Sequence, residues 1–224
     1  MITSPSNPTG TTIAFDTLKS VCDLAKERGA WRIVDETYLD LADREPDGSD
    51  VKSVLACDPD AIVCSSFSKF FGMTGWRLGW MVVPECALEA MDDLATNFFL
   101  CAHTPTQHAA LACFTPETWP CARNVVRSCW SVVALWSTDW LRSVCRWRLS
   151  RMARSMRTST FPAPVLTRGR LRTCVKGSAR GVDAGRDFGE ATADTHVRLS
   201  YAASREALRE GLRRIGDFVA ELHG

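Results

Sequence analysis

Short apolar, β-prone runs recur through the first 118 residues of this chain, with helix-like segments between and beside them. The runs are Trp31–Asp35, Ala61–Ser65 and Gly79–Val83. Each has the length and the apolar character of a strand that is buried on both faces of a sheet. Because strands that alternate with helices form parallel sheets, the sequence predicts an α/β fold with a mainly parallel sheet.

Helical spacing accounts for the segments beside these runs. One apolar stripe has the i, i+3, i+4, i+7 spacing of an amphipathic helix and consists of Leu18, Val21, Cys22 and Ala25. Asp16 is the expected N-cap of this helix and Gly29 its expected end. Two further helices are expected, one from Pro84 to about Asn97 and one over Thr104–Phe114.

The C-terminal tail is equally regular. His196–Tyr201 has the composition of a strand, and Ser204 is the expected N-cap of the helix that follows. One face of that helix carries the apolar residues Leu208, Leu212, Ile215, Val219 and Leu222. We interpret this helix as a packing element without chemistry of its own.

Residues 119–184 have an unusual composition and separate these two orderly parts. The segment holds 13 basic residues against two acidic ones, a net charge of +11, whereas the whole chain carries +1. It also contains five of the eight Trp residues, and neither a helical nor a strand period runs through it. The chain is therefore not uniform in composition.

Two interpretations of residues 119–184 stay open. Clustered Arg with aromatic residues can contact phosphates and stack on bases, which favours a nucleic-acid-binding arm. Alternatively, Arg, Trp, Cys and Ser are the residues that a shifted reading frame of GC-rich DNA tends to encode. Because both flanks have an orderly pattern, we favour two compensating frame errors, and we expect no nucleic-acid partner.

Membrane, secretory and metal-binding classes lack support in the sequence. The start of the chain has no basic and apolar leader, and no apolar run approaches the roughly 20 residues that span a bilayer. The ten Cys form no C-x-x-C pair, and the cluster Cys101, His103, His108 and Cys113 lacks a zinc-site spacing, so we expect no metal. Scattered thiols without an export signal indicate a cytoplasmic protein.

The strongest chemical signal is the string Ser66–Gly79, which follows the predicted strand 61–65. Lys69 therefore lies beyond the carboxyl end of a strand, where open α/β sheets bind ligands. Its amine can form a Schiff base with a phosphate-bearing aldehyde, Ser66 and Ser68 offer hydroxyls, and Arg77 offers a planar guanidinium for the phosphate. Glycines within the string allow the backbone to turn and to approach closely.

This string resembles the cofactor-lysine signature of the class I/II, fold-type-I aminotransferases, in the aspartate aminotransferase-like branch. Two further motifs stand upstream in the family's order, Asn7–Gly10 (N-P-T-G) and Asp35–Tyr38 (D-E-T-Y). The resemblance covers about residues 3–118 and 185–222. It implies the large domain of that fold, followed by part of a small α+β domain.

The resemblance implies pyridoxal 5′-phosphate (PLP) as the cofactor and a role for each matching residue. Lys69 would hold PLP and act as the general base, and Asp35 would pair with the protonated ring nitrogen, which makes the ring a better electron sink. Tyr38 and Asn7 would contact the 3′-oxygen. Arg198 would bind the substrate α-carboxylate in a bidentate pair, with Asn7 beside it.

The implied function is the transfer of an amino group between an L-amino acid and a 2-oxo acid by a ping-pong Schiff-base mechanism in a homodimer. The chain departs from the family in its short stretch before Asn7 and in residues 119–184. We therefore expect a partial PLP-binding domain over 1–118, an aberrant segment over 119–184 and the end of the small domain over 185–224. We also expect this chain to be an inactive fragment.

Two other function classes stay open. Another fold-type-I PLP enzyme, such as a C–S β-lyase, would use Lys69, Asp35 and Arg77 in the same way. A non-catalytic protein would use the Arg- and Trp-rich segment for binding. The sequence does not identify which amino acid and which oxo acid would react.

Overall fold

The computed structural model divides the chain into two compact units. The first comprises residues 1–6 and 12–126, and the second comprises residues 7–11 and 127–224. Within β5, β6 and β7 of the second unit, the structure describes the backbone alone. The residues described are 1–42, 45, 47–124, 126, 156–160, 182–184, 190, 196–200 and 203–223.

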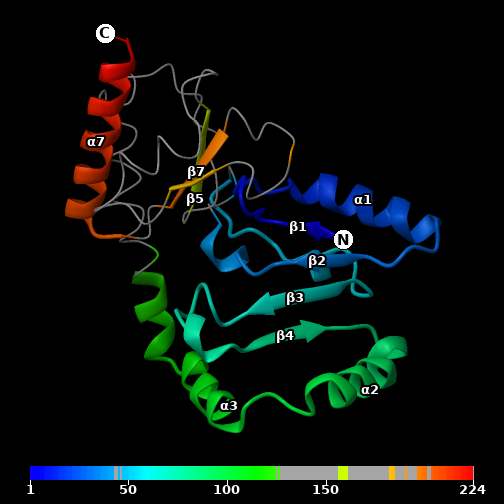
Figure 1. Ribbon diagram of the computed structural model, residues 1–224. Coiled ribbons are helices and arrows are strands. Elements are labelled where there is room, and N and C mark those ends of the chain that lie inside the picture. Colours follow the sequence, from blue (N-terminus) through cyan, green and yellow to red (C-terminus); the bar gives the residue numbers. More distant parts are fainter. Residues whose placement is uncertain are drawn as a thin grey trace. The chain divides into compact units, whose positions relative to one another are not determined.

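The first unit is built on a four-stranded sheet with the order β1-β2-β3-β4 (Figure 1). β1 to β3 run parallel and β4 is antiparallel to β3, which confirms the predicted mainly parallel sheet. The strands are β1 (Ile2–Thr3), β2 (Ile33–Asp35), β3 (Ile62–Ser66) and β4 (Gly79–Val82). Three of its α-helices are α1 (Phe15–Glu27), α2 (Leu88–Phe99) and α3 (Thr104–Leu111), and residues 118–124 are helical as well. The 3₁₀ helices are η1 (Leu39–Leu41), η2 (Val54–Ala56), η3 (Thr74–Trp76), η4 (Glu85–Ala87) and η5 (Ala112–Phe114).

Helix α1 differs from the prediction at its start. The helix begins at Phe15 with Ala14 as the N-cap, so Asp16 lies in the first turn and the expected Asp16 cap is wrong. A carboxylate in the first turn still stabilises the helix, because it lies near the positive end of the helix dipole. The expected end is confirmed, because α1 stops at Glu27 and Gly29 adopts a φ of +64°.

Two apolar clusters form the core of the first unit. In the first cluster, Leu18 and Cys22 of α1 pack with Val34 of β2 and Val63 of β3. Val21 of the same predicted stripe is 42% exposed, so the prediction is wrong for that residue. In the second cluster, buried residues of the loop after β3 pack against the α3–η5 region through Phe67, Met73, Ala110 and Cys113. The second cluster therefore includes buried residues from both sides of Lys69 in the loop that carries it.

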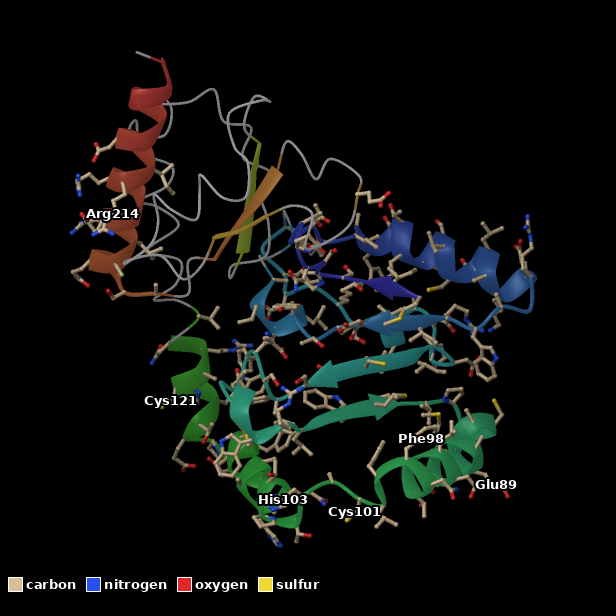
Figure 2. The ribbon with its side chains drawn as sticks, in the orientation of Figure 1. Glu89, Phe98, Cys101, His103, Cys121 and Arg214 are labelled. Carbon is tan, nitrogen blue, oxygen red and sulfur yellow. The ribbon has the colours of Figure 1, made fainter. Side chains whose placement is uncertain are left out.

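Strand β4 contradicts the expectation of burial on both faces. All four of its residues are exposed, including Trp80 and Met81. In the described part of the chain, β4 pairs with β3 alone and forms one edge of the sheet. Helix α2 buries none of its described residues, and Phe98 projects from it with 78% exposure (Figure 2).

The described part of the second unit contains an antiparallel sheet and one long helix. The sheet order is β5-β7-β6, and its strands are β5 (Met156–Thr160), β6 (Val182–Ala184) and β7 (His196–Ser200). Helix α7 (Arg205–His223) follows β7, as the sequence predicts. Ser204 caps α7, since its Oγ accepts the Ala207 N–H at 3.2 Å. The strands β5 and β6 were not expected, because their sequences lack an apolar–polar alternation.

Candidate functional site

Asp35 and Tyr38 lie where β2 ends. Asp35 is the last residue of β2 and is opposite Cys64 in the parallel register with β3. Its Oδ1 accepts the Thr37 N–H at 2.9 Å, so the side chain folds over the start of the following turn. Tyr38 is buried, with 8% exposure, and immediately precedes η1. The D-E-T-Y motif thus forms a tight turn at the carboxyl edge of the sheet.

Ser66 organises the loop after β3. It is the last residue of that strand, and its Oγ accepts the Ser68 N–H at 3.0 Å and donates to the Leu78 carbonyl at 3.3 Å. Thr74 Oγ1 donates to the Ser68 carbonyl at 2.7 Å, and this bond joins the end of the loop to its beginning. The chain therefore makes a closed turn around Lys69.

Lys69 is exposed at the tip of this turn, and its Nζ lies 5.5 Å from the centre of the Tyr38 ring. An ammonium within about 6 Å of a ring face is attracted by the π electrons. The contact joins the loop after β3 to the turn after β2. The carboxyl ends of two neighbouring parallel strands thus bring together the D-E-T-Y turn and the predicted cofactor lysine.

Buried aromatic residues hold the backbone on both sides of Lys69. Phe67 and Phe70 are 6% and 8% exposed. Phe67 contacts Trp80 with ring centres 4.8 Å apart, and Phe70 contacts Trp119 at 5.1 Å. Because both flanks of the turn are anchored in the core, the lysine backbone is fixed while its side chain stays accessible.

The second half of the string has special backbone geometry. Arg77 is exposed and adopts the left-handed conformation, with a φ of 53°, and its guanidinium donates to the Thr74 carbonyl at 3.3 Å. Gly72 also has a positive φ, of 69°. A Cβ added at Gly79 would lie 2.7 Å from the Ser65 carbonyl oxygen, so only glycine fits there.

Glu36 is a site residue that sequence reasoning missed. It is 5% exposed, and burial raises the pKa of its carboxyl group. Its Oε1 accepts the Val54 N–H at 2.7 Å. The sequence carries no period that signals this contact, because the donor lies in a separate loop. A charged residue directly after a short buried strand was the one available hint.

Two predicted site residues belong to the second unit. Asn7 lies in the segment 7–11 of that unit, and Arg198 lies in β7, opposite Thr158 and Asp183. The side chain of Arg198 lies outside the described residues. The described geometry therefore assembles Asp35, Tyr38, Ser66, Ser68 and Lys69, with Arg77 at the end of the same loop.

Other kinds of site find no support among the described residues. No group of three or more His, Cys, Asp or Glu in this part of the chain is placed to hold a metal ion. Among the same residues, no helix has both the length and the apolar composition that crossing a membrane requires.

Known proteins resemble this chain along most of its length. Residues 1–119 match the model of the family described as "Aminotransferase class I and II". A valine–pyruvate aminotransferase of Mycobacterium tuberculosis is 31% identical over 98% of this chain and 56% of its own length. An aspartate aminotransferase of Sulfolobus acidocaldarius is 27% identical over 99% of this chain and 56% of its own.

A solved structure agrees with these sequence relatives. The crystal structure of an aminotransferase from Mycobacterium tuberculosis superimposes with a TM-score of 0.87 at 30% identity. The match covers 98% of this chain and 57% of that protein. The chain therefore spans about half the length of the curated relatives and the solved structure that it matches.

Proposed function

Because the chain belongs to the class I and II aminotransferase family, we propose that it carries the cofactor lysine of a transaminase, and that this residue is Lys69. Members of this family depend on PLP. The observation that carries the proposal is the contact of Lys69 Nζ with the Tyr38 ring at 5.5 Å, beside the strand end that bears Asp35. The amine and the ring come from the loops after two neighbouring strands, and Asp35 ends the first of these strands.

The described side chains fit PLP by their chemistry. The cofactor presents an aldehyde, a phenolic oxygen, a ring nitrogen and a phosphate. Lys69 offers an amine for the aldehyde, Tyr38 a phenol for the oxygen, and Asp35 a carboxylate for the protonated nitrogen. Ser68 offers a hydroxyl and Arg77 a guanidinium for the phosphate. Ser66 would donate to the phosphate in exchange for its 3.3 Å bond to the Leu78 carbonyl.

Each residue then has a defined task in amino transfer. PLP, when bound, would supply an electron sink for the pair left when the substrate Cα–H bond breaks. Lys69 would hold the cofactor through its Nζ and, as a free amine, would take the proton from Cα as a general base. Asp35 would keep the ring nitrogen of the cofactor protonated, since a nearby carboxylate favours the charged form of that nitrogen.

Asn7 and Arg198 complete the proposed site. Asn7 would donate a hydrogen bond to the phenolic oxygen of the cofactor and lie beside the substrate. Arg198 would bind the substrate α-carboxylate through two parallel N–H···O bonds, which orients the Cα–H bond. The role of Asn7 is supported by the motif resemblance and by the family model, which matches residues 1–119. The role of Arg198 is supported by the motif resemblance and by relatives that match 98% of the chain or more.

The proposed substrates are an L-amino acid and a 2-oxo acid. The names of the two relatives fit this class, since one describes valine and pyruvate as its substrates and the other aspartate. We propose a cytoplasmic homodimer without nucleic-acid or membrane partners. Because the chain spans about half the length of these relatives, turnover is proposed for a chain of their full length that carries these residues.

A product assay tests the reaction. The 224-residue chain and a chain of the relatives' full length that contains it are each incubated with PLP, an amino acid and a 2-oxo acid. We expect the longer chain to convert the oxo acid to its amino acid without releasing ammonia, and the 224 residues alone not to turn over. Release of ammonia and pyruvate from a cysteine-type substrate would instead indicate a β-lyase. An unchanged PLP spectrum with both chains would contradict the proposal.

The domain organisation is proposed as predicted, with residues 1–118 in the PLP-binding domain and 185–224 in the small domain. Residues 119–184 would be a stretch read in a shifted frame. Translating the coding DNA across codons 115–190 in all three frames tests this idea. We expect another frame to encode a stretch of balanced charge with one Trp or none. If no frame improves on the present one, the segment is a genuine insertion.

A further inference from the structure

Glu36 is a buried carboxyl group inside the turn that carries Asp35 and Tyr38. The residue is 5% exposed, and the proposed function gives it no role. Burying a carboxyl group is unfavourable unless hydrogen bonds compensate for the lost water. The burial of Glu36 between Asp35 and Tyr38 therefore depends on the hydrogen bonds that its carboxyl group makes.

The hydrogen bonds of Glu36 connect three segments. Its backbone N–H donates to the Cys64 carbonyl of β3 at 2.8 Å. Its side chain accepts the Val54 N–H at 2.7 Å and a hydrogen bond from the Ser53 side chain. Ser53 Oγ in turn accepts the Leu55 N–H at 3.2 Å, which caps η2. The carboxyl group is thus held by a structured 3₁₀ turn.

The same residue shapes the turn that follows it. The Glu36 carbonyl accepts the Leu39 N–H at 2.9 Å, which closes the turn around Tyr38. On the other side, the Asp35 carbonyl accepts the Ser4 N–H at 3.1 Å. The turn that carries Asp35 and Tyr38 is therefore held to β3 and to η2 by the hydrogen bonds of Glu36.

We propose that Glu36 is a positioning residue, whose side-chain bond to η2 holds Asp35 and Tyr38 in place beside Lys69. This inference rests on the proposed function, because it assigns Glu36 a task only if Lys69 holds PLP. The role requires a hydrogen-bond acceptor and not a negative charge. Glutamine therefore preserves it and alanine removes it.

Asp58 provides a matched control in the same chain. It is also a buried carboxylate with 5% exposure, and it pairs with Arg32 through bonds of 2.8 and 3.0 Å. Arg32 directly precedes β2, and Asp58 lies before β3, so this pair lies at the amino ends of the two strands. Asp58→Ala thus disturbs the same sheet at the end away from Lys69.

The experiment uses the 224-residue chain with PLP itself. Borohydride reduction followed by peptide mapping gives the rate of labelling at Lys69, and hydrogen exchange of the 35–38 segment reports the turn without any cofactor. We expect Glu36→Ala to slow the labelling about tenfold and to speed the exchange, as the loss of a hydrogen bond to a buried acceptor predicts. Glu36→Gln should restore both values, and Asp58→Ala should lower the unfolding midpoint while leaving both unchanged.

The outcomes separate this inference from the proposed function. Label at Lys69 in every variant at the same rate would overturn the role of Glu36 and leave the function intact. Equal slowing by Glu36→Ala and Asp58→Ala would also overturn it, because general destabilisation would then suffice. No label at Lys69 in either the unaltered chain or a chain of the relatives' full length that contains it would overturn both proposals. If Glu36→Ala does not fold, Ser53→Ala replaces it, with a smaller slowing expected and an unchanged rate contradicting the idea.

Discussion

The Nζ of Lys69 lies 5.5 Å from the centre of the Tyr38 ring, although the two residues follow different strands. The contact exists because β2 and β3 are parallel neighbours whose carboxyl ends meet at one edge of the sheet. The ring of Tyr38 is buried and therefore presents a fixed surface to a lysine that is otherwise exposed.

Substitutions at Tyr38 separate the ring from its hydroxyl group. Tyr38→Phe keeps the ring but removes the phenol proposed for the cofactor's phenolic oxygen, so we expect PLP to label Lys69 about fivefold less, the scale of one lost hydrogen bond. Tyr38→Ala removes the buried ring as well, and we expect labelling to fall further. Labelled fractions at limiting PLP check this expectation, and equal labelling of the two variants would contradict it.

The Arg32–Asp58 pair predicts a stability that depends on pH in one direction. The Arg32 guanidinium lowers the pKa of Asp58, so the folded state favours the ionised carboxylate. The stabilisation is present above the ordinary pKa of 3.8 and is lost as the pH falls through the lowered value. We expect Asp58→Asn to lose about 3 kcal/mol of unfolding free energy near pH 7. Urea unfolding at several pH values should show this deficit shrinking below pH 3.8; a constant deficit would argue against the pair.

For Glu36, the unfolding free energy is expected to depend on pH in the opposite direction. Burial raises its pKa above the ordinary 4.5, so its contribution to stability is present below that pH and is lost as the pH rises through the raised value. Glu36→Gln cannot ionise. We therefore expect the unaltered chain to lose unfolding free energy relative to Glu36→Gln as the pH rises above 4.5. Parallel pH profiles for the two proteins would show that folding does not raise the pKa of Glu36.

Two glycines of the lysine string form a matched pair. A Cβ at Gly79 would meet the Ser65 carbonyl oxygen at 2.7 Å, whereas nothing lies within 4 Å of a Cβ at Gly75. We expect Gly79→Ala to lower the unfolding free energy by about 1–3 kcal/mol because backbone must move. Gly75→Ala should change it by less than about 0.5 kcal/mol. Denaturant unfolding measures both changes. Similar losses for the two variants would refute the idea that only Gly79 excludes a Cβ.

Local pattern explains what the sequence predicted. Leu18 and Cys22 follow a helical period, and both are buried in α1. The string around Lys69 predicts this residue as the cofactor lysine from the sequence alone, and the assignment stays a prediction. By contrast, the exposure of β4 depends on which elements cover it, and the strand's own apolar residues predict burial.

Contacts between distant segments were beyond sequence reasoning for the same reason. The Glu36 carboxyl group meets a backbone N–H of η2, and a backbone donor leaves no mark on residue type. The cap of α1 was misplaced because Asp16 and Ala14 both stand at the start of the stripe, and side-chain preference alone favours Asp.

The central claim is that Lys69 is the residue that holds the cofactor, and the most direct test locates the covalent bond. A chain of the relatives' full length that contains these residues is incubated with PLP, reduced with borohydride, digested and mapped, with Lys69→Arg as the control. We predict a pyridoxyl group on Lys69 and none at comparable yield on Lys19, Lys26, Lys52 or Lys176. Label on another lysine, or equal label on all five, would contradict the assignment.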